Sequence, residues 1–172
     1  MSYIEIVILR RLFGGPCHGY ELRKRVEEIT GVTLHNNSLY PALKRFEEAG
    51  AVTKAAQEQQ GRPARLVYTI TDTGRELLHD MLAGLPPDQA ADDSEFLVRL
   101  GQFSLISRSE QAVVLANRTA AVRDRLAHLR ALRDTGGTRD ERWGVLVTDE
   151  LTRRDERELD WLAGLVTLAE SG

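Results

Sequence analysis

Residues 33–50 read TLHNNSLYPALKRFEEAG, and this stretch decides how the chain is expected to fold. Its apolar side chains recur at the spacing of one face of an α-helix, at Leu39, Leu43 and Phe46. The far face carries side chains that donate hydrogen bonds or positive charge, namely Tyr40, Lys44 and Arg45. The pattern predicts an amphipathic helix that packs on a core with one face and presents the other outward.

Residue chemistry also predicts where this helix begins and ends. The polar run 36–38 supplies good N-cap residues, and Pro41, which has no backbone N–H, fits only near a helix start. We therefore expect the N-cap at about Asn37 or Ser38 and the end of the helix at Gly50. A free helix N-terminus with polar side chains suits a phosphate or a base edge, because unpaired N–H groups and the helix dipole favour negative charge there. The working hypothesis is DNA recognition.

The segments around this helix are typical of a winged helix-turn-helix domain with a two-stranded wing. Two helices are expected before it, over residues 3–13 and 18–30, and two β-rich runs after it, over 52–57 and 66–71. The polar segment 58–63 joins the two runs as a hairpin. The helix over 3–13 is apolar nearly all round, so we expect one of its faces to meet something besides its own domain.

The second half of the chain is predicted to be a separate helical domain. The breaker sequence at 84–87, Gly-Leu-Pro-Pro, marks the boundary between domains 1–84 and 85–172. Beyond it, long helices are expected over 109–134 and 140–170, with apolar residues suited to helix pairing. The predicted fold is therefore mostly α, with an N-terminal winged helix and a C-terminal α-helical dimerisation domain.

Charge and composition narrow the classes of function. The net charge of the 172 residues is −3, which argues mildly against a nucleic-acid binder. Residues 1–84 hold 11 basic and 10 acidic side chains (+1), and residues 85–172 hold 12 and 16 (−4), so any basic surface is small and lies in the first half. The single cysteine, Cys17, excludes an internal disulfide. No apolar stretch approaches the roughly 20 residues that span a bilayer, so we expect a cytoplasmic protein without a membrane partner.

Three blocks of the first half resemble the PadR family of bacterial transcriptional regulators. They are HGYELRKRVEE at 18–28, SLYPALKRFEEAG at 38–50 and GRPARLVYTITDTGRELL at 61–78, and they occur in the order and spacing of the family. The resemblance covers residues 3–84 well and is only architectural over 95–170. It implies a homodimer that binds double-stranded DNA, and it favours control by a small aromatic or other apolar effector.

The resemblance also implies which residues contact DNA. Those at the DNA-facing end of the recognition helix are Ser38, Tyr40, Pro41 and Lys44, and those on the wing are Arg62 and Arg65. The chemistry agrees independently, because hydroxyl and ammonium groups donate to phosphates. The side chains that can reach base edges are His35, Asn36 and Asn37, and asparagine suits adenine.

Each of these residues has an ordinary structural interpretation as well. Tyr40 could cover the edge of the core, and Lys44 could pair with Glu48 on a solvated helix face. The two wing arginines are ordinary surface residues unless a ligand approaches them. The chain departs from the family at Ala64 and Leu66, where basic and aromatic residues are common, so we expect the wing to hold phosphates weakly.

Trp143 and Trp161 lie on the same predicted helix, and two interpretations of them stay open. Tryptophans on a long helix are more often core or dimer contacts, but they can also line a flat pocket for an effector. Between them, the wholly charged run 153–158 could interrupt a dimer seam and leave room for a ligand, or could be plain surface.

No catalytic, cofactor or metal motif appears in the sequence. There is no Gly-rich phosphate loop, no zinc-protease motif and no nucleophile elbow, and His18 beside Cys17 lacks further ligands at metal-binding spacing. We therefore expect no enzyme, no cofactor and no metal. The sequence predicts a ligand-responsive repressor that acts as a homodimer on a pseudo-palindromic operator. The alternative is a winged-helix module that binds a protein partner without binding DNA.

Overall fold

The computed structural model describes residues 3–31, 36–59, 62–134 and 142–171. The chain divides into two compact units, Met1–Leu82 and Ala83–Gly172. Within the described ranges, no helix combines the length and the apolar character needed to cross a bilayer.

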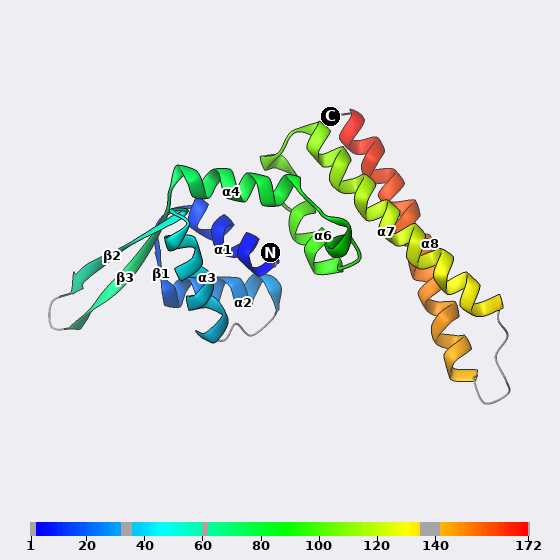
Figure 1. Ribbon diagram of the computed structural model, residues 1–172, viewed down its shortest axis with the longest axis horizontal. Helices are drawn as coiled ribbons and strands as arrows, with labels where there is room; N and C mark the ends of the chain where they lie inside the picture. Colours follow the sequence, from blue (N-terminus) through cyan, green and yellow to red (C-terminus); the bar gives the residue numbers. More distant parts are fainter. Residues whose placement is uncertain (1–2, 32–35, 60–61, 135–141, 172) are drawn as a thin grey trace. The chain divides into compact units, whose positions relative to one another are not determined.

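Unit 1 is a winged helix (Figure 1). Its elements follow in the order α1 (Tyr3–Phe13), β1 (Cys17–His18), α2 (Gly19–Thr30), α3 (Asn36–Glu48), β2 (Val52–Gln59), β3 (Arg62–Ile70) and α4 (Asp72–Ala83). The strands form an antiparallel sheet in the order β1-β3-β2, and the long β2–β3 hairpin is the wing. The predicted fold class is thus confirmed. The sequence did not predict β1, which pairs Cys17 with Tyr68.

The core of unit 1 uses the predicted face of α3. Its buried side chains are Leu39, Ala42, Leu43 and Phe46. α1 packs against α2 and β3, and the whole run 6–9 of α1 is buried. The chain itself therefore covers most of α1, and the expectation that a partner covers a surplus face of this helix stays a prediction.

The two ends of α3 are set by different local rules. The helix begins at Asn36, slightly before the predicted start, so Pro41 is its sixth residue and lies inside it. At the other end Gly50 has φ +69°, a left-handed conformation that favours glycine. The N–H groups of Gly50 and Ala51 donate to the carbonyls of Glu47 (3.0 Å) and Phe46 (2.8 Å), the pattern of a Schellman motif. The predicted end at Gly50 is confirmed.

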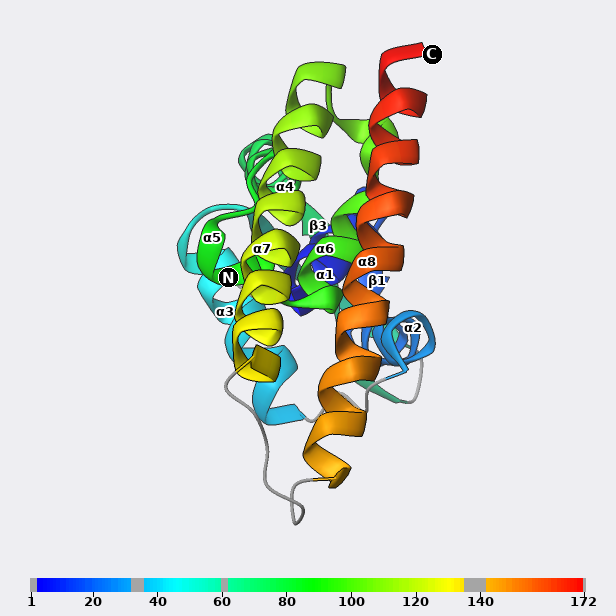
Figure 2. The ribbon, with the colours of Figure 1, turned by 90° about the vertical axis from the view of Figure 1, so that its right-hand side faces the viewer.

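Unit 2 is built around two long helices that run side by side (Figure 2). Its elements are α5 (Pro87–Ala90), α6 (Asp93–Leu100), the short 3-10 helix η1 (Phe103–Leu105), α7 (Arg108–Asp134) and α8 (Arg142–Ser171). Phe96 of α6, Val114 and Val122 of α7, and Leu162 of α8 are fully buried in one core. Apolar side chains of the second half of α8, such as Leu159 and Val166, pack against this core.

Buried arginine side chains join the helices of unit 2. Arg118 of α7 is only 1% exposed, pairs with Asp93 and with Glu158 (2.6 Å), and donates to the carbonyl of Ala90 (2.9 Å). Its guanidinium also lies over the ring of Phe96, 5.3 Å from the ring centre. A buried cation with this many partners holds α5, α6 and α8 to α7.

The charged run 153–158 takes part in the same contact. Asp155 is 2% exposed, and its carboxylate accepts two hydrogen bonds from Arg125 Nε (3.0 Å each) and one from Arg125 Nη2 (2.7 Å). Glu158 pairs with Arg118, whereas Arg153 stays exposed. The run is therefore not plain surface, because its inward carboxylates face the arginines of α7.

Candidate nucleic-acid interface

The face of α3 opposite the core is exposed and polar. Ser38, Pro41 and Lys44 are exposed, and Tyr40 keeps 45% of its surface accessible. Tyr40 and Lys44 are four residues apart, so they lie on one face of the helix. The geometry thus brings a phenol hydroxyl and an ammonium group together, both of which are phosphate donors.

The two cations of α3 have different surroundings. Lys44 Nζ lies 3.6 Å from Glu48, and both side chains are largely exposed, so this pair is weak and Lys44 can exchange Glu48 for a phosphate. Arg45 Nη2 lies 2.5 Å from the carboxylate of Glu5, which is buried in α1. Arg45 therefore anchors α3 to α1, since its loss would leave a buried carboxylate without this cation.

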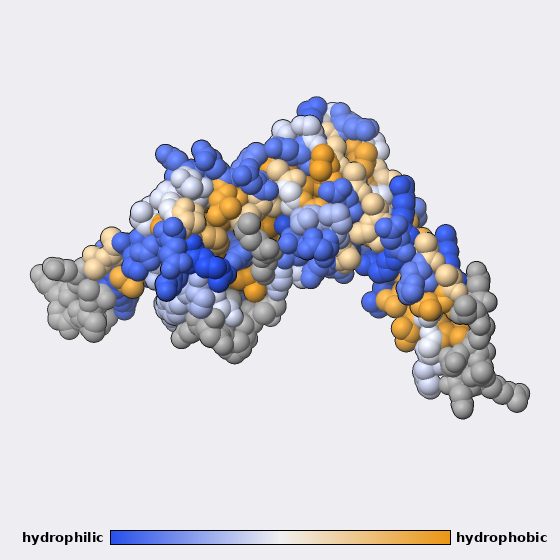
Figure 3. All heavy atoms as spheres, in the orientation of Figure 1, coloured by the Kyte–Doolittle hydropathy of each residue, from blue (hydrophilic) through white to orange (hydrophobic). Residues whose placement is uncertain are grey.

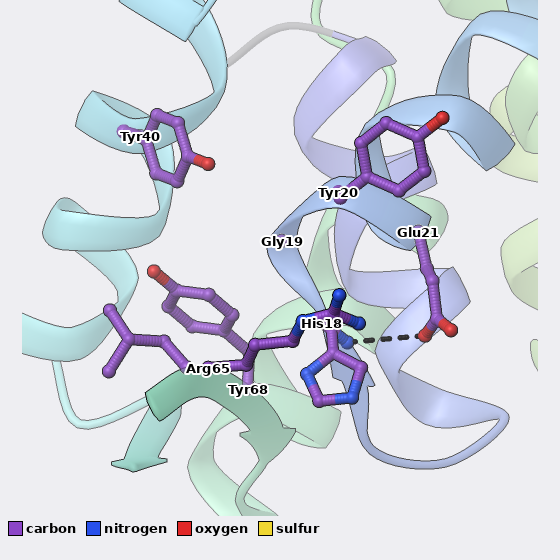
Figure 4. Close-up of a pocket in the computed structure, with 8 residues that line it drawn as sticks. His18, Gly19, Tyr20, Glu21, Tyr40, Arg65 and Tyr68 are labelled. Atoms are coloured by element: carbon purple, nitrogen blue, oxygen red, sulfur yellow. Dashed lines mark hydrogen bonds between the residues drawn. The ribbon is translucent and has the colours of Figure 1, made fainter. Parts of the chain in front are cut away.

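A groove of about 620 Å³ lies where the start of α2, the exposed face of α3 and strand β3 meet. We call it the tyrosine groove, and it is lined by His18, Gly19, Tyr20, Glu21, Tyr40, Arg65, Leu66 and Tyr68. Figure 4 shows Tyr40 on α3, Tyr20 on α2, and Arg65 and Tyr68 on β3 around this space. Hydroxyl and guanidinium donors from three elements thus surround one concave surface.

Gly19 allows two tyrosine rings to approach the start of α2. A Cβ atom at this position would lie 3.4 Å from Cε1 of Tyr40 and 3.5 Å from Cε2 of Tyr68. Both rings therefore pack on the backbone of Gly19, which limits the directions that Tyr40 can take. Burial raises the pKa of Tyr68, so its phenol stays neutral and keeps a proton to donate.

Arg65 is the arginine and Glu21 the acidic residue among the described lining residues of the tyrosine groove. Arg65 is exposed. Glu21 Oε2 accepts the backbone N–H of His18 (3.3 Å), as a residue in the first turn does in a capping box. The carboxylate is thus engaged at the start of α2, while the cation and the hydroxyl groups are available to an anion.

The structure brings some of the predicted site residues together and does not describe others. Tyr40 and Arg65 meet in the tyrosine groove, beside the exposed face of α3. Four predicted side chains lie outside the described part of the chain: those of His35, Asn36, Asn37 and Arg62. DNA contact by any of the predicted residues stays a prediction.

Tyr20 and Tyr68 are groove residues that the sequence did not single out. Tyr20 is 66% exposed, and the Arg23 guanidinium lies 5.5 Å from its ring centre. The sequence could have indicated Tyr20, because an aromatic residue on the outer face at the start of a predicted helix is a candidate for a binding surface. Tyr68 gave no such signal, because a tyrosine within a β-rich run has the pattern of an ordinary core residue.

The two tryptophans lie far apart on α8. Trp143 is 77% exposed, whereas Trp161 meets the ring of Phe96 edge to face, with centroids 6.1 Å apart and an interplanar angle of 82°. Their 18-residue separation corresponds to about 27 Å along a helix. One small effector therefore does not contact both tryptophans of one chain, and effector binding at either one stays a prediction.

Comparison with known proteins agrees with the fold described above. Residues 8–80 match the model of the "Transcriptional regulator PadR-like family". The chain is 29% identical to the "Negative transcriptional regulator PadR" of Bacillus subtilis over 112 residues, which cover 64% of this chain and 62% of that protein. It thus spans about three fifths of the length of that relative.

Two solved structures are also similar. A PadR family transcription regulator from Clostridium difficile R20291 is 32% identical, with 45% of this chain and 80% of that chain covered and a TM-score of 0.42. Bacillus subtilis PadR in complex with operator DNA is 22% identical, with 98% and 99% covered and a TM-score of 0.47.

The winged helix of unit 1 places the protein in a broad class of domains that commonly contact nucleic acids. The match over residues 8–80 defines this class further. The chain belongs to the PadR-like family of transcriptional regulators.

Proposed function

We propose that the protein is a sequence-specific DNA-binding transcriptional regulator that contacts its operator through α3 and the wing. The observation that carries the proposal is the set of donors around the tyrosine groove, Tyr40 and Arg65, next to the exposed Lys44. A helix fits the major groove of DNA, and donors on both of its sides reach the flanking phosphates. The N-terminal residues of α3 and the preceding His35 then read base edges.

The regulator acts as a homodimer on a pseudo-palindromic site. A single unit with so little net positive charge binds DNA weakly, and two-fold pairing adds the contribution of a second half-site. The start of α8 supports this proposal, because large apolar side chains are exposed there, among them Trp143, Leu146 and Val147. Figure 3 shows orange, hydrophobic surface over this part of the helix. In such a dimer the two copies of α3 are spaced by about 34 Å, one turn of the duplex.

The relative in Bacillus subtilis is a negative regulator, which supports repression as the mode of action. We further propose that a small aromatic or apolar effector that settles near Trp143 or Trp161 at the dimer seam changes the half-site spacing and releases DNA. A repressor of this kind acts in the cytoplasm and has no enzymatic activity.

A gel shift with the promoter DNA of the protein's own gene tests DNA binding. The wild type is compared with Lys44→Glu at two salt concentrations, and Arg153→Glu, an exposed site on α8 with the same change of charge, is the control. We expect Lys44→Glu to weaken binding and to reduce the salt slope by about 0.9, the value of one phosphate contact, while the control binds like the wild type. Binding without salt dependence, or equal binding by both variants, would contradict the proposal.

A further inference from the structure

Unit 2 contains an apolar groove between the first residues of α7 and the last turns of α8. Its volume is about 390 Å³, within the range of small-molecule sites. Leu100 and Phe103 form one wall, and Leu165 and Leu168 of α8 form the other. Leu168 is 68% exposed, so part of this apolar surface still faces water. Arg108, the first residue of α7, also lines this space, which we call the Arg108 groove.

The polar groups near the Arg108 groove are already engaged, with one exception. Gln111 Nε2 donates to the carbonyls of Phe103 (2.8 Å) and Ile106 (3.2 Å). The side chain of Glu110 accepts hydrogen bonds from the N–H and the hydroxyl of Ser107, 2.7 Å each. The Glu110 bonds cap the start of α7, and the Gln111 bonds engage the amide NH2 group with the segment before this helix.

Arg108 is the exception. Several other arginines of unit 2 are held by carboxylates: Arg99 by Glu95, Arg118 by Asp93 and Glu158, and Arg125 by Asp155. The exposed Arg123 of α7 has no such partner among the described residues, but it does not line the groove. The guanidinium of Arg108 has no ion pair with any carboxylate in the described part of the chain. An exposed cation without a carboxylate partner among the described residues thus stands at a groove whose other lining residues, apart from Gln111, are apolar.

The position of Glu170 decides on which side of Arg108 an anion fits. A second and smaller cavity of about 210 Å³ is lined by Arg108, Val166 and Glu170. The carboxylate of Glu170 repels an anion from that side. The larger groove, which contains no acidic side chain among its described lining residues, is therefore the side that favours a negative head group.

We propose that the Arg108 groove binds a small amphipathic carboxylate with an apolar body, of the kind represented by a medium-chain fatty acid. The carboxylate pairs with the guanidinium, which offers a fork of N–H donors matched to two oxygens. The apolar body covers Leu165 and Leu168 and removes them from water. The site lies within unit 2 and is distinct from Trp143 and from the tyrosine groove.

Titration of the full chain with sodium decanoate tests this proposal. Trp161 lies one helical turn before Leu165, so in a Trp143→Phe background it is the single tryptophan reporter for the groove. We expect a saturable fluorescence change and a matching heat in calorimetry, both below the micelle concentration. Arg108→Gln should weaken the affinity by at least about tenfold, since a charge-assisted pair is lost. Decanol, which lacks the charge, should bind the wild type with a similarly reduced affinity.

Two further variants separate a specific site from general apolar binding. Arg123→Gln removes an exposed arginine elsewhere on α7 and should bind decanoate like the wild type, whereas Leu168→Glu places a carboxylate in the groove and should abolish binding. Equal affinity of Arg108→Gln and Arg123→Gln would overturn the proposal. So would dissociation of a dimer by decanoate over the same concentration range, because the groove would then be a contact between two copies. The assay contains no DNA, so its failure leaves the proposed regulatory function untouched.

Discussion

At the scale of single residues, Gly74 shows how closely α4 approaches the base of the wing. It is the third residue of α4, and a Cβ atom there would lie 2.1 Å from the carbonyl oxygen of Ala51 and 2.7 Å from Cγ1 of Ile70. The Thr71 hydroxyl donates to the Gly50 carbonyl (2.7 Å) and accepts the Gly74 N–H (3.1 Å), which fixes this approach. No side chain can enter without a backbone shift.

We therefore expect Gly74→Ala to lower the free energy of unfolding of unit 1 by about 3 kcal/mol, the upper range for an overpacked site. Gly144→Ala is the matched control, because a Cβ atom at this helical position meets nothing within 4 Å. Alanine there should stabilise α8 by about 0.5–1 kcal/mol, the difference in helix propensity. Urea unfolding followed by circular dichroism measures both, and a neutral Gly74→Ala would show that α4 can move away from the sheet.

At the same scale, Cys17 provides a test of whether β1 pairs stably with β3. It is 2% exposed and lies opposite Tyr68 in the sheet. Burial raises the pKa of the Cys17 thiol, so the reactive thiolate is disfavoured in the folded chain. The stability that the buried, neutral Cys17 thiol contributes is fully present below the pKa of the unfolded thiol. It is lost as the pH rises above that pKa.

At pH 8 we expect a thiol reagent to modify native Cys17 at least about tenfold more slowly than the urea-unfolded chain, since the reaction must wait for local opening. Equal rates in the two states would mean that β1 is not stably paired. The variant Cys17→Ala, which should not react at all, confirms that the signal comes from this residue.

At the scale of elements, local patterns predicted α3 well, and non-local contacts explain what was missed. The spacing of Leu39, Leu43 and Phe46 depends only on helix geometry, and so does the role of Gly50 after the helix. Strand β1 has two residues and exists only because β3 lies beside it, which no local pattern contains. Arg65 could be placed on the wing, but that it lines one groove together with Tyr20 could not be predicted, because the start of α2 is remote in sequence.

The same limit applies to α8. Its two apolar clusters look alike in the sequence, yet Leu162 is fully buried while Trp143 is exposed, because Phe96 of α6 packs against only one of them. The charged run 153–158 is equally ambiguous, since only the register of α7 against α8 shows that Asp155 faces Arg125. The sequence predicted the helices themselves, but it did not predict how they pair with one another.

This pairing yields a prediction for α8. Asp155→Asn removes the charge of a carboxylate that is 2% exposed and leaves Arg125, itself about one third exposed, without its main anion. We expect a loss of about 3 kcal/mol in the free energy of unfolding of unit 2, the lower range for breaking a buried pair. Asp160→Asn, an exposed aspartate on the same helix, should change it by less than about 0.5 kcal/mol. Urea unfolding followed by Trp161 fluorescence in a Trp143→Phe background measures both, and equal stabilities would mean that apolar packing alone holds α8 in place.

At the scale of the whole molecule, the proposed regulator needs a second copy, and the exposed apolar side chains suggest where it binds. Large apolar side chains are exposed near the end of α7 and at the start of α8, namely Leu132, Trp143, Val145, Leu146 and Val147. Large contiguous apolar patches on a protein surface commonly mark protein contacts. The partner proposed here is an identical chain, and a two-fold contact of this kind uses the same surface on both copies.

The double variant Leu146→Glu, Val147→Glu tests this directly, because it sets like charges of two copies against each other while both positions are solvent-exposed in one chain. We expect light scattering at micromolar concentration to give dimers for the wild type and monomers for the variant, with unchanged helix content by circular dichroism. Ala163→Glu, an exposed site in the second half of α8, should remain dimeric. The monomeric variant should also lose most of its operator affinity although α3 is intact, because each half-site then binds alone. If the variant stays dimeric, the dimer interface lies elsewhere on the protein. If the variant is monomeric but keeps full operator affinity, two-fold pairing is not needed for DNA binding.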